Sequence, residues 1–187
     1  MSSQDAARWN QRYQTRDRNA VPSPRAFLVE QADALPQHGQ ALDVAMGLGG
    51  NAAFLLARGL QVVGLDISEV AVREAKSRWP DLQVVLADLS RFDLPVAAFD
   101  VIINFYFLDR KLWPVYRQAL KPSGILIIET LTEDMVSVRP DIDPVYLLKS
   151  GELRAAFQDW DIVTYREKWI DQEGWQRAVA SLVARRP

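Results

Sequence analysis

One stretch constrains the fold of this chain more than any other, and it reads ALDVAMGLGGNAAFLLARGLQVVGLDIS, from Ala41 to Ser68. It opens with an apolar run of strand length and breaks where three glycines fall within four positions. A helical pattern follows, and a second apolar run ends at Asp66. This order predicts a strand, a glycine loop, a helix and a second strand that carries an acid at its end.

The rest of the chain continues to alternate strands with helices. Apolar runs predict strands at 81–88, 99–106 and 124–130, and helical spacing predicts helices at 24–35, 68–80, 109–122 and 150–157, with Ser68 and Ser150 as N-caps. Two further strands, at 160–170 and 176–186, suit an antiparallel hairpin. We therefore expect an α/β fold, with helices on both faces of a parallel sheet that is mixed at one edge.

Composition narrows the classes of function. The net charge of −2 gives no basic field for nucleic acid, and no apolar run approaches the roughly 20 residues of a membrane span. Cysteine is absent and His38 is the single histidine, which excludes cysteine nucleophiles and histidine-rich metal centres, so no metal is expected. The N-terminus has no signal-peptide core, and we expect a cytoplasmic protein that binds neither membrane nor nucleic acid.

The chain divides into an arm and a body. Residues 1–25 are polar and rich in arginine, whereas the core pattern begins near Phe27. Apart from alanines, Trp9 and Tyr13 supply most of the apolar character of the arm. We therefore expect an N-terminal arm or lid at 1–25, followed by one domain at 26–187.

The glycine loop fits two kinds of cofactor. Gly47, Gly49 and Ala52 match the dinucleotide pattern Gly-x-Gly-x-x-Ala, which is weak evidence by itself. Three features favour a sulfonium cofactor with an amino group. Asp43 lies inside the first strand, Asp88 ends the third strand where an adenine amino group would lie, and the chain ends in a hairpin instead of a second mononucleotide-binding half.

Longer segments carry a resemblance to a known family. ALDVAMGLGGN, LADLS, FDVIINFYFLDR and LKPSGILIIET, with Asp66 after the first, resemble a class I S-adenosylmethionine-dependent methyltransferase. WNQRY at 9–13, Leu-Asp-Arg at 108–110 and the segment 144–153 are similar to the bacterial tellurite-resistance and thiopurine methyltransferase-like group. One departure is Ala45, which replaces the usual first glycine of the loop. The resemblance implies a Rossmann-like seven-stranded mixed sheet of order 3-2-1-4-5-7-6, with the seventh strand antiparallel.

The resemblance also implies a cofactor site for S-adenosylmethionine. It would consist of Asp43, Ala45, Gly47, Gly49, Asp66, Ile67, Asp88, Leu89 and Asn104. The glycines would admit the methionine part, and Asp43 would support the loop and the ammonium group.

The remaining cofactor residues would hold the nucleoside and the methyl end. Asp66 would accept both ribose hydroxyls and Ile67 would pack on the adenine. Asp88 would accept the adenine amino proton, and Leu89 would donate its backbone amide to the ring. Asn104 would place its carbonyl near the ammonium and the transferring methyl.

The acceptor site is predicted from aromatic and cationic residues. Tyr106, in the segment NFYF, is expected to face the pocket as the catalytic residue, and Trp9, Arg12, Tyr13 and Arg110 are expected to contact the substrate. Arginines there suit an oxyanion or a carboxylated small molecule. NFYF lacks both prolines of the Asn-Pro-Pro-Tyr/Phe motif found in enzymes that methylate bases or glutamine amides.

These observations favour an enzyme that methylates a small molecule. Two alternatives stay open at this point, an NAD-dependent oxidoreductase and a non-catalytic module that binds S-adenosylmethionine. The sequence names neither the acceptor atom nor the oligomeric state.

Overall fold

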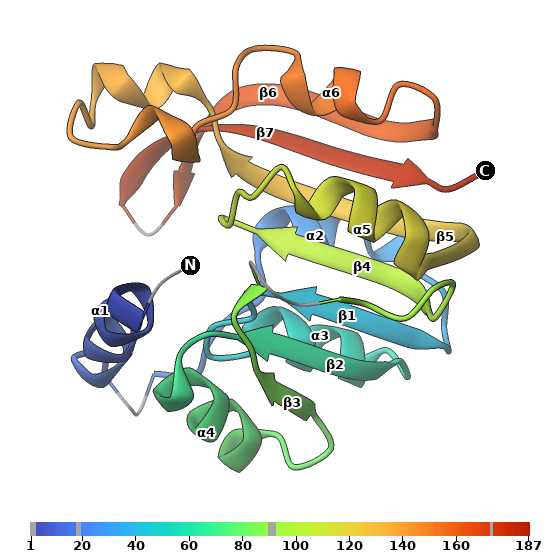
Figure 1. The fold of residues 1–187 in the computed structure, drawn as a ribbon, viewed down its shortest axis with the longest axis horizontal. Coiled ribbons are helices and arrows are strands. Elements are labelled where there is room, and N and C mark those ends of the chain that lie inside the picture. Colours follow the sequence, from blue (N-terminus) through green and yellow to red (C-terminus); the bar gives the residue numbers. More distant parts are fainter. Residues whose placement is uncertain (1–2, 18–19, 90–92, 173) are drawn as a thin grey trace.

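The structure is a computed structural model that describes residues 3–17, 20–89, 93–172 and 174–187. In these residues one seven-stranded sheet has the order β3-β2-β1-β4-β5-β7-β6 (Figure 1). The strands are β1 (Gln40–Val44), β2 (Gln61–Asp66), β3 (Gln83–Leu86), β4 (Phe99–Phe105), β5 (Leu120–Leu131), β6 (Asp161–Gln172) and β7 (Trp175–Arg185). The first five run parallel, and β7 is antiparallel to both β5 and β6. The predicted fold class, strand order and terminal hairpin are confirmed.

Alternating side chains bury the two faces of the sheet. On one face Leu42, Ile102 and Leu126 pack with α5 (Leu112–Ala119) and α6 (Glu152–Ala156). On the other, strand residues one position earlier pack with α2 (Ala26–Glu30), α3 (Gly50–Ala57) and α4 (Glu69–Arg78). Strands buried on both faces must be apolar at consecutive positions, which is why their sequence runs are continuous.

Several element boundaries differ from the predicted ones. The helix expected at 24–35 ends at Glu30 and continues as a short 3-10 helix at Ala32–Ala34, and β5 starts four residues early, at Leu120. Ser68 caps α4, since its hydroxyl accepts from the amide of Ala71. Ser150 does not cap α6. Gly151 occupies that position with φ +74°, and the Ser150 hydroxyl donates to Glu167 instead.

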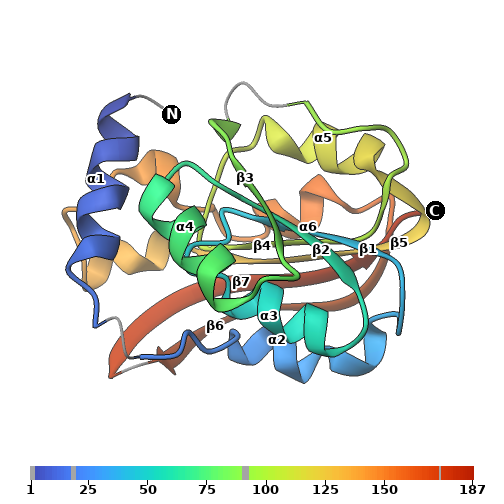
Figure 2. The same cartoon turned by 90° about the horizontal axis from the view of Figure 1, so that it is seen from below.

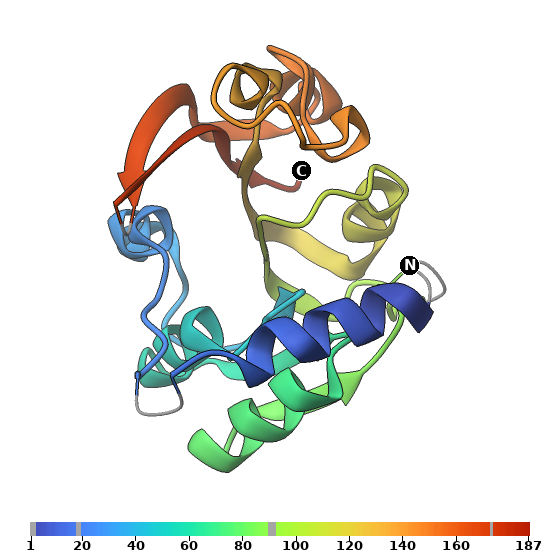
Figure 3. The ribbon, with the colours of Figure 1, turned by 90° about the vertical axis from the view of Figure 1, so that its left-hand side faces the viewer.

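The N-terminal arm contains a helix that the sequence did not predict. Figures 2 and 3 show α1 (Ser3–Gln14) lying beside α4, at the edge of the sheet that holds β3. Asn10 fixes the contact, because its Oδ1 accepts from the Ser68 hydroxyl at 2.7 Å and from the Val70 amide at 3.2 Å. Asn10 thus acts as a second, external cap of α4. Among the described helices, none is both long and apolar enough to cross a membrane.

Candidate functional site

A cavity of about 970 Å³ lies at the carboxyl ends of the parallel strands, between the body and α1. This is where open α/β sheets bind ligands. Nine of the predicted site residues line it: Trp9, Arg12, Tyr13, Ala45, Gly47, Asp66, Ile67, Leu89 and Tyr106. The volume lies near the upper end of the roughly 300–1,000 Å³ of small-molecule sites, so a cofactor and an acceptor can share it.

The loop after β1 takes a strained path into this cavity. Ala45, Gly47 and Gly49 have φ angles of +56°, +56° and +77°. A Cβ at Gly47 would lie 2.8 Å from the Tyr13 hydroxyl, which the end of that side chain could relieve by shifting, so it is the left-handed conformation that favours glycine here. Ala45 adopts a left-handed conformation that glycine takes readily, at a cost of about 1–2 kcal/mol.

Asp66 holds this loop in place. Its Oδ2 accepts from the Gly47 amide and its Oδ1 from the Ser68 amide, both at 2.8 Å. The carboxylate is buried, and burial raises its pKa against the opposing effect of these amides. A carboxylate has about four acceptor sites, so Asp66 keeps capacity for two ligand hydroxyls at the cavity wall.

Asp43 is a buried acid behind the loop. One side-chain interaction is with the amide of Ala52, and within the described residues its Oδ2 has no hydrogen-bond partner. Burial, with the nearby charge of Asp66, raises the pKa of Asp43 from 3.8 to about 8. A buried acceptor without a donor suits a position that supports a cationic ligand group.

The raised pKa of Asp43 predicts a pH-dependent stability. Between its unfolded value of 3.8 and its folded value of about 8, the folded state holds a proton that the unfolded state has lost. Its contribution to the free energy of unfolding is therefore fully present below about pH 4 and is lost as the pH rises to about 8. Asp43→Asn should remove this slope. In urea unfolding we expect the stability of the variant relative to wild type to grow up to about pH 8 and then level off. Parallel pH curves would contradict the assignment.

Tyr106 forms one wall of the cavity where β4 ends. Its φ of +59° is rare for a bulky residue. Its hydroxyl donates to Glu129 Oε1 at 3.2 Å, and the guanidinium groups of Arg25 and Arg177 lie 4.7 and 5.4 Å from its ring centroid. Burial and the adjacent Glu129 raise the pKa of Tyr106 to about 12, so the phenol is neutral at physiological pH. Its role in catalysis stays a prediction.

Five predicted site residues are not among the described residues that line the cavity: Asp43, which lies behind the loop, and Gly49, Asp88, Asn104 and Arg110. Gly49 directly precedes α3 and packs against Trp79, and its contact with the cofactor stays a prediction. The Asn104 side chain donates to the hydroxyl of Tyr116 at 2.8 Å, on the face of the sheet that α5 covers. Its side-chain Oδ1 is buried and has no hydrogen-bond partner among the described residues, and the contact of its backbone carbonyl with the cofactor stays a prediction. Asp88 is half-buried just before Leu89.

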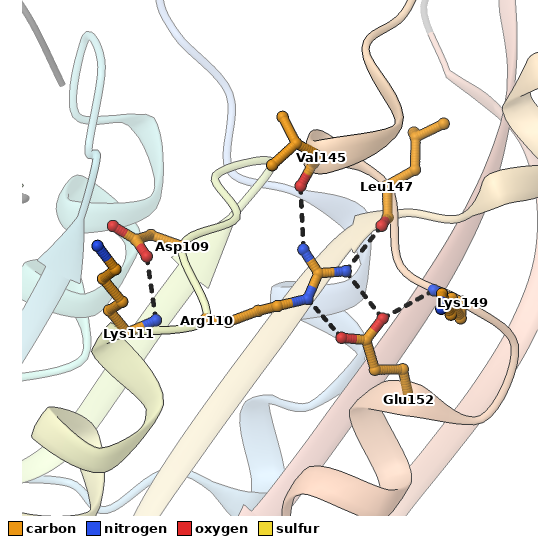
Figure 4. A network of polar contacts seen from close by, with 7 residues as sticks. All are labelled: Asp109, Arg110, Lys111, Val145, Leu147, Lys149 and Glu152. Atoms are coloured by element: carbon orange, nitrogen blue, oxygen red, sulfur yellow. Dashed lines mark hydrogen bonds and ion pairs between the residues drawn. The ribbon is translucent and has the colours of Figure 1, made fainter.

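Arg110 holds a segment of chain and lies outside the cavity lining (Figure 4). Its guanidinium donates to the carbonyls of Val145 and Leu147, at 3.0 and 2.9 Å, and forms a two-point ion pair with Glu152. Glu152 also accepts from the Lys149 amide. The two segments that resemble the tellurite-resistance group, 108–110 and 144–153, therefore hold each other in place through these contacts of Arg110, which we call the Arg110 clamp. The structure gives no separate support to a contact between Arg110 and the substrate.

Removing this clamp should affect stability more than binding. Arg110→Ala leaves two carbonyls and Glu152 without their charged partner, and we expect the free energy of unfolding to fall by about 1–2 kcal/mol. The affinity for S-adenosylhomocysteine should stay within about twofold of wild type. Chemical denaturation and calorimetry measure the two quantities. Glu152→Gln is the matched control, and it should show a smaller loss. A large fall in affinity with unchanged stability would restore Arg110 to the site.

The structure adds residues that the sequence analysis missed. Asn10 docks α1, and the guanidinium groups of Arg25 and Arg177 lie over the Tyr106 ring. Glu129 is buried between Tyr106 and Ser181, whose hydroxyl donates to it at 2.7 Å. An acid within the apolar run GILIIET was a usable signal for Glu129, because buried acids need partners. The arginines carried no local signal.

Comparison with known proteins shows which proteins this chain is similar to. Residues 41–124 match a family model described as a methyltransferase domain. A probable S-adenosylmethionine-dependent methyltransferase of Mycobacterium tuberculosis is 31% identical over 121 residues, which cover 61% of this chain and 43% of that protein. The 2-heptyl-1-hydroxyquinolin-4(1H)-one methyltransferase of Mycobacteroides abscessus is 30% identical over 146 residues, covering 71% and 62%. The chain thus spans less than two thirds of the length of both relatives.

The fold is also similar to that of solved structures. TehB from Haemophilus influenzae superposes with a TM-score of 0.73 at 17% identity, covering 97% of this chain and 67% of that one. At this identity the likeness concerns the fold alone.

The residues of the cavity fit S-adenosylmethionine, the cofactor in the name of the M. tuberculosis relative. The left-handed turn at Ala45 to Gly49 leaves backbone room, and Asp66 has acceptor sites beyond its two amide bonds. The unpartnered oxygen of Asp43 lies behind the same loop. Ile67 and Leu89 supply apolar wall where the nucleoside is expected.

Proposed function

We propose that this chain is a class I S-adenosylmethionine-dependent methyltransferase that transfers the methyl group of that cofactor to a small organic acceptor, a proposal that the fold and the family model support. The observation that carries the proposal is that the glycine loop, Asp66 and Tyr106 line the same cavity. The glycine loop and Asp66 suit the cofactor, and Tyr106 lines the space where an acceptor would bind.

The chain's own residues would position the reactants and exclude water. When bound, the cofactor would supply an electrophilic methyl group on a sulfonium sulfur; an acceptor atom would bond to the methyl carbon in line, and the sulfur would leave as a neutral thioether. Asp66 and the loop fix the cofactor end of the cavity. The neutral Tyr106 ring, tied to Glu129, forms an aromatic wall, and such a wall favours a cationic methylsulfonium. Trp9 and Tyr13 of α1 stack at 5.8 Å and close another side.

The finer assignment to the tellurite-resistance and thiopurine methyltransferase-like group is part of this proposal. It draws on the segments at 9–13, 108–110 and 144–153 and on the fold of TehB. The methyltransferase from M. abscessus is named for an alkylated hydroxyquinolone, which supports an organic acceptor.

Calorimetry tests the proposed function and its two alternatives. We expect S-adenosylhomocysteine to bind and NAD not to bind; tight NAD binding would point to an oxidoreductase. Labelled S-adenosylmethionine with a panel of thiols, thiopurines, selenite, tellurite, carboxylates and amines then tests turnover. Binding without transfer to any of these acceptors would favour a module that only binds the cofactor.

A further inference from the structure

The acceptor side of the cavity joins two arginines from opposite ends of the chain. Arg25 precedes α2 and Arg177 lies in β7, yet both guanidinium groups lie within 5.4 Å of the Tyr106 ring centroid. Both arginines line the cavity and are half-buried. Both guanidinium groups lie over the same ring, and planar guanidinium groups are well suited to bind a carboxylate or another planar anion.

The charge of the lining supports an anionic ligand. Among the described lining residues the charged ones are Arg12, Arg16, Asp17, Arg25, Asp66, Arg139 and Arg177. Asp66 is committed to the loop amides on the cofactor side. Arg139 pairs with Asp141, which is exposed. The cationic excess of the lining is notable because the whole chain has a net charge of −2.

A second, apolar wall faces the same space. Leu131, Met135 and Ile142 come from the end of β5 and the segment after it, and Trp175 comes from the β6–β7 hairpin. Met135, Leu131 and Ile142 form a small apolar cluster separate from the two sheet cores. Trp175 is 67% exposed. A large aromatic residue left exposed on a cavity rim is typical of a binding contact.

The apolar wall has a rigid support. Thr132 pairs with Leu148 in an isolated bridge, and the Glu133 amide donates to the Leu148 carbonyl. The Arg110 clamp holds Val145 and Leu147 from the other side. The segment from β5 to α6 is therefore tied at both ends, which suits a preformed binding surface.

From this arrangement we propose that the acceptor is an amphipathic organic anion. Its acidic group binds between Arg25 and Arg177 at the Tyr106 ring, and its apolar body lies against Met135, Ile142 and Trp175. This inference rests on the proposed function, which it narrows to one class of acceptor. An inorganic oxyanion would use the arginines and leave the apolar wall unused.

Binding of simple probes tests the proposal without knowledge of the natural acceptor. The probes are 1-naphthoate, its neutral analogue 1-naphthalenemethanol, and inorganic phosphate, each titrated into protein saturated with S-adenosylhomocysteine. We expect 1-naphthoate to bind at least tenfold more tightly than either of the others, with an affinity that falls as salt is added. Equal binding of the alcohol would overturn the anion subsite, and equal binding of phosphate would overturn the apolar wall.

Three variants locate the site. Arg25→Gln and Arg177→Gln should each weaken 1-naphthoate roughly tenfold, and Trp175→Ala should weaken it severalfold while phosphate binding is unchanged. Arg154→Gln is the matched control, because Arg154 of α6 lies over the ring of Tyr165 in β6 and does not line the cavity. Melting temperatures check that each variant is folded. Unaltered 1-naphthoate affinity in folded Arg25→Gln and Arg177→Gln would refute the proposal.

The same titrations separate this inference from the proposed function. If S-adenosylhomocysteine itself does not bind, the proposed function fails, and titration of 1-naphthoate into the unloaded protein still decides whether the anion subsite exists. If S-adenosylhomocysteine binds and 1-naphthoate does not, the methyltransferase assignment stands and the acceptor class is wrong.

Discussion

Replacing Asp66 by alanine is expected to weaken S-adenosylhomocysteine binding by about 2–4 kcal/mol. The variant would lose the carboxylate expected to accept both ribose hydroxyls. It would also free the amides of Gly47 and Ser68, which Asp66 holds at 2.8 Å. Since the Gly47 bond shapes the loop, part of the loss should come from a less ordered site. Calorimetry measures the dissociation constant, and an unchanged value would remove Asp66 from the cofactor site.

Two comparisons separate these contributions. Asp66→Asn keeps one acceptor oxygen and should lose less affinity than Asp66→Ala. Asp88→Ala should cost about 1–2 kcal/mol, because one neutral amino donor is at stake and water can replace the lost partner. A larger loss for Asp88→Ala than for Asp66→Ala would contradict the predicted division between ribose and adenine. Circular dichroism of all three variants checks that the fold is retained.

The predictable parts of the fold are those that depend on residues close together in the sequence. Apolar runs between helical segments predict the parallel strands. The glycines at 47–50 predict a turn, because glycine readily adopts the left-handed backbone conformation. Both signals lie within a few residues of the element that they predict. The cap at Ser68 was also predictable from local sequence, because its partner Ala71 is only three residues away. Ser150 was the wrong cap, because Gly151 beside it takes the left-handed turn more readily.

The parts that were not predictable depend on contacts between distant residues. Asn10 and Ser68 are 58 positions apart, so nothing local marks α1 as a helix that docks on α4. Arg25 and Arg177 lie over the same ring only because β7 lies beside β5 and the chain before α2 passes the end of β4. Arg110 was assigned by family pattern, and a pattern does not say whether a matching residue contacts ligand or holds the chain.

Deleting residues 1–20 is expected to leave a folded protein that binds S-adenosylhomocysteine but loses most methyl transfer, by about 100-fold or more. Apart from Trp9 and Tyr13, which are half-buried, most described residues of α1 are exposed. The body keeps both sheet cores without α1. The deletion opens the cavity to water beside Gly47, where the Tyr13 hydroxyl now lies. Single-turnover assays with the best acceptor of the panel, together with calorimetry, measure transfer and affinity separately.

Asn10→Ala is the finer test of the same idea. It removes the acceptor that joins α1 to Ser68 and Val70 while keeping Trp9 and Tyr13, so transfer should fall less than in the deletion. Trypsin can report the docking directly, because Arg8 and Arg12 lie within α1. If α1 closes over bound cofactor, S-adenosylhomocysteine should slow cleavage there and change the fluorescence of Trp9, and Trp9→Phe should reduce that change. Equal cleavage with and without S-adenosylhomocysteine, together with a sharply lower melting temperature after deletion, would make α1 a permanent part of the fold and rule out the lid.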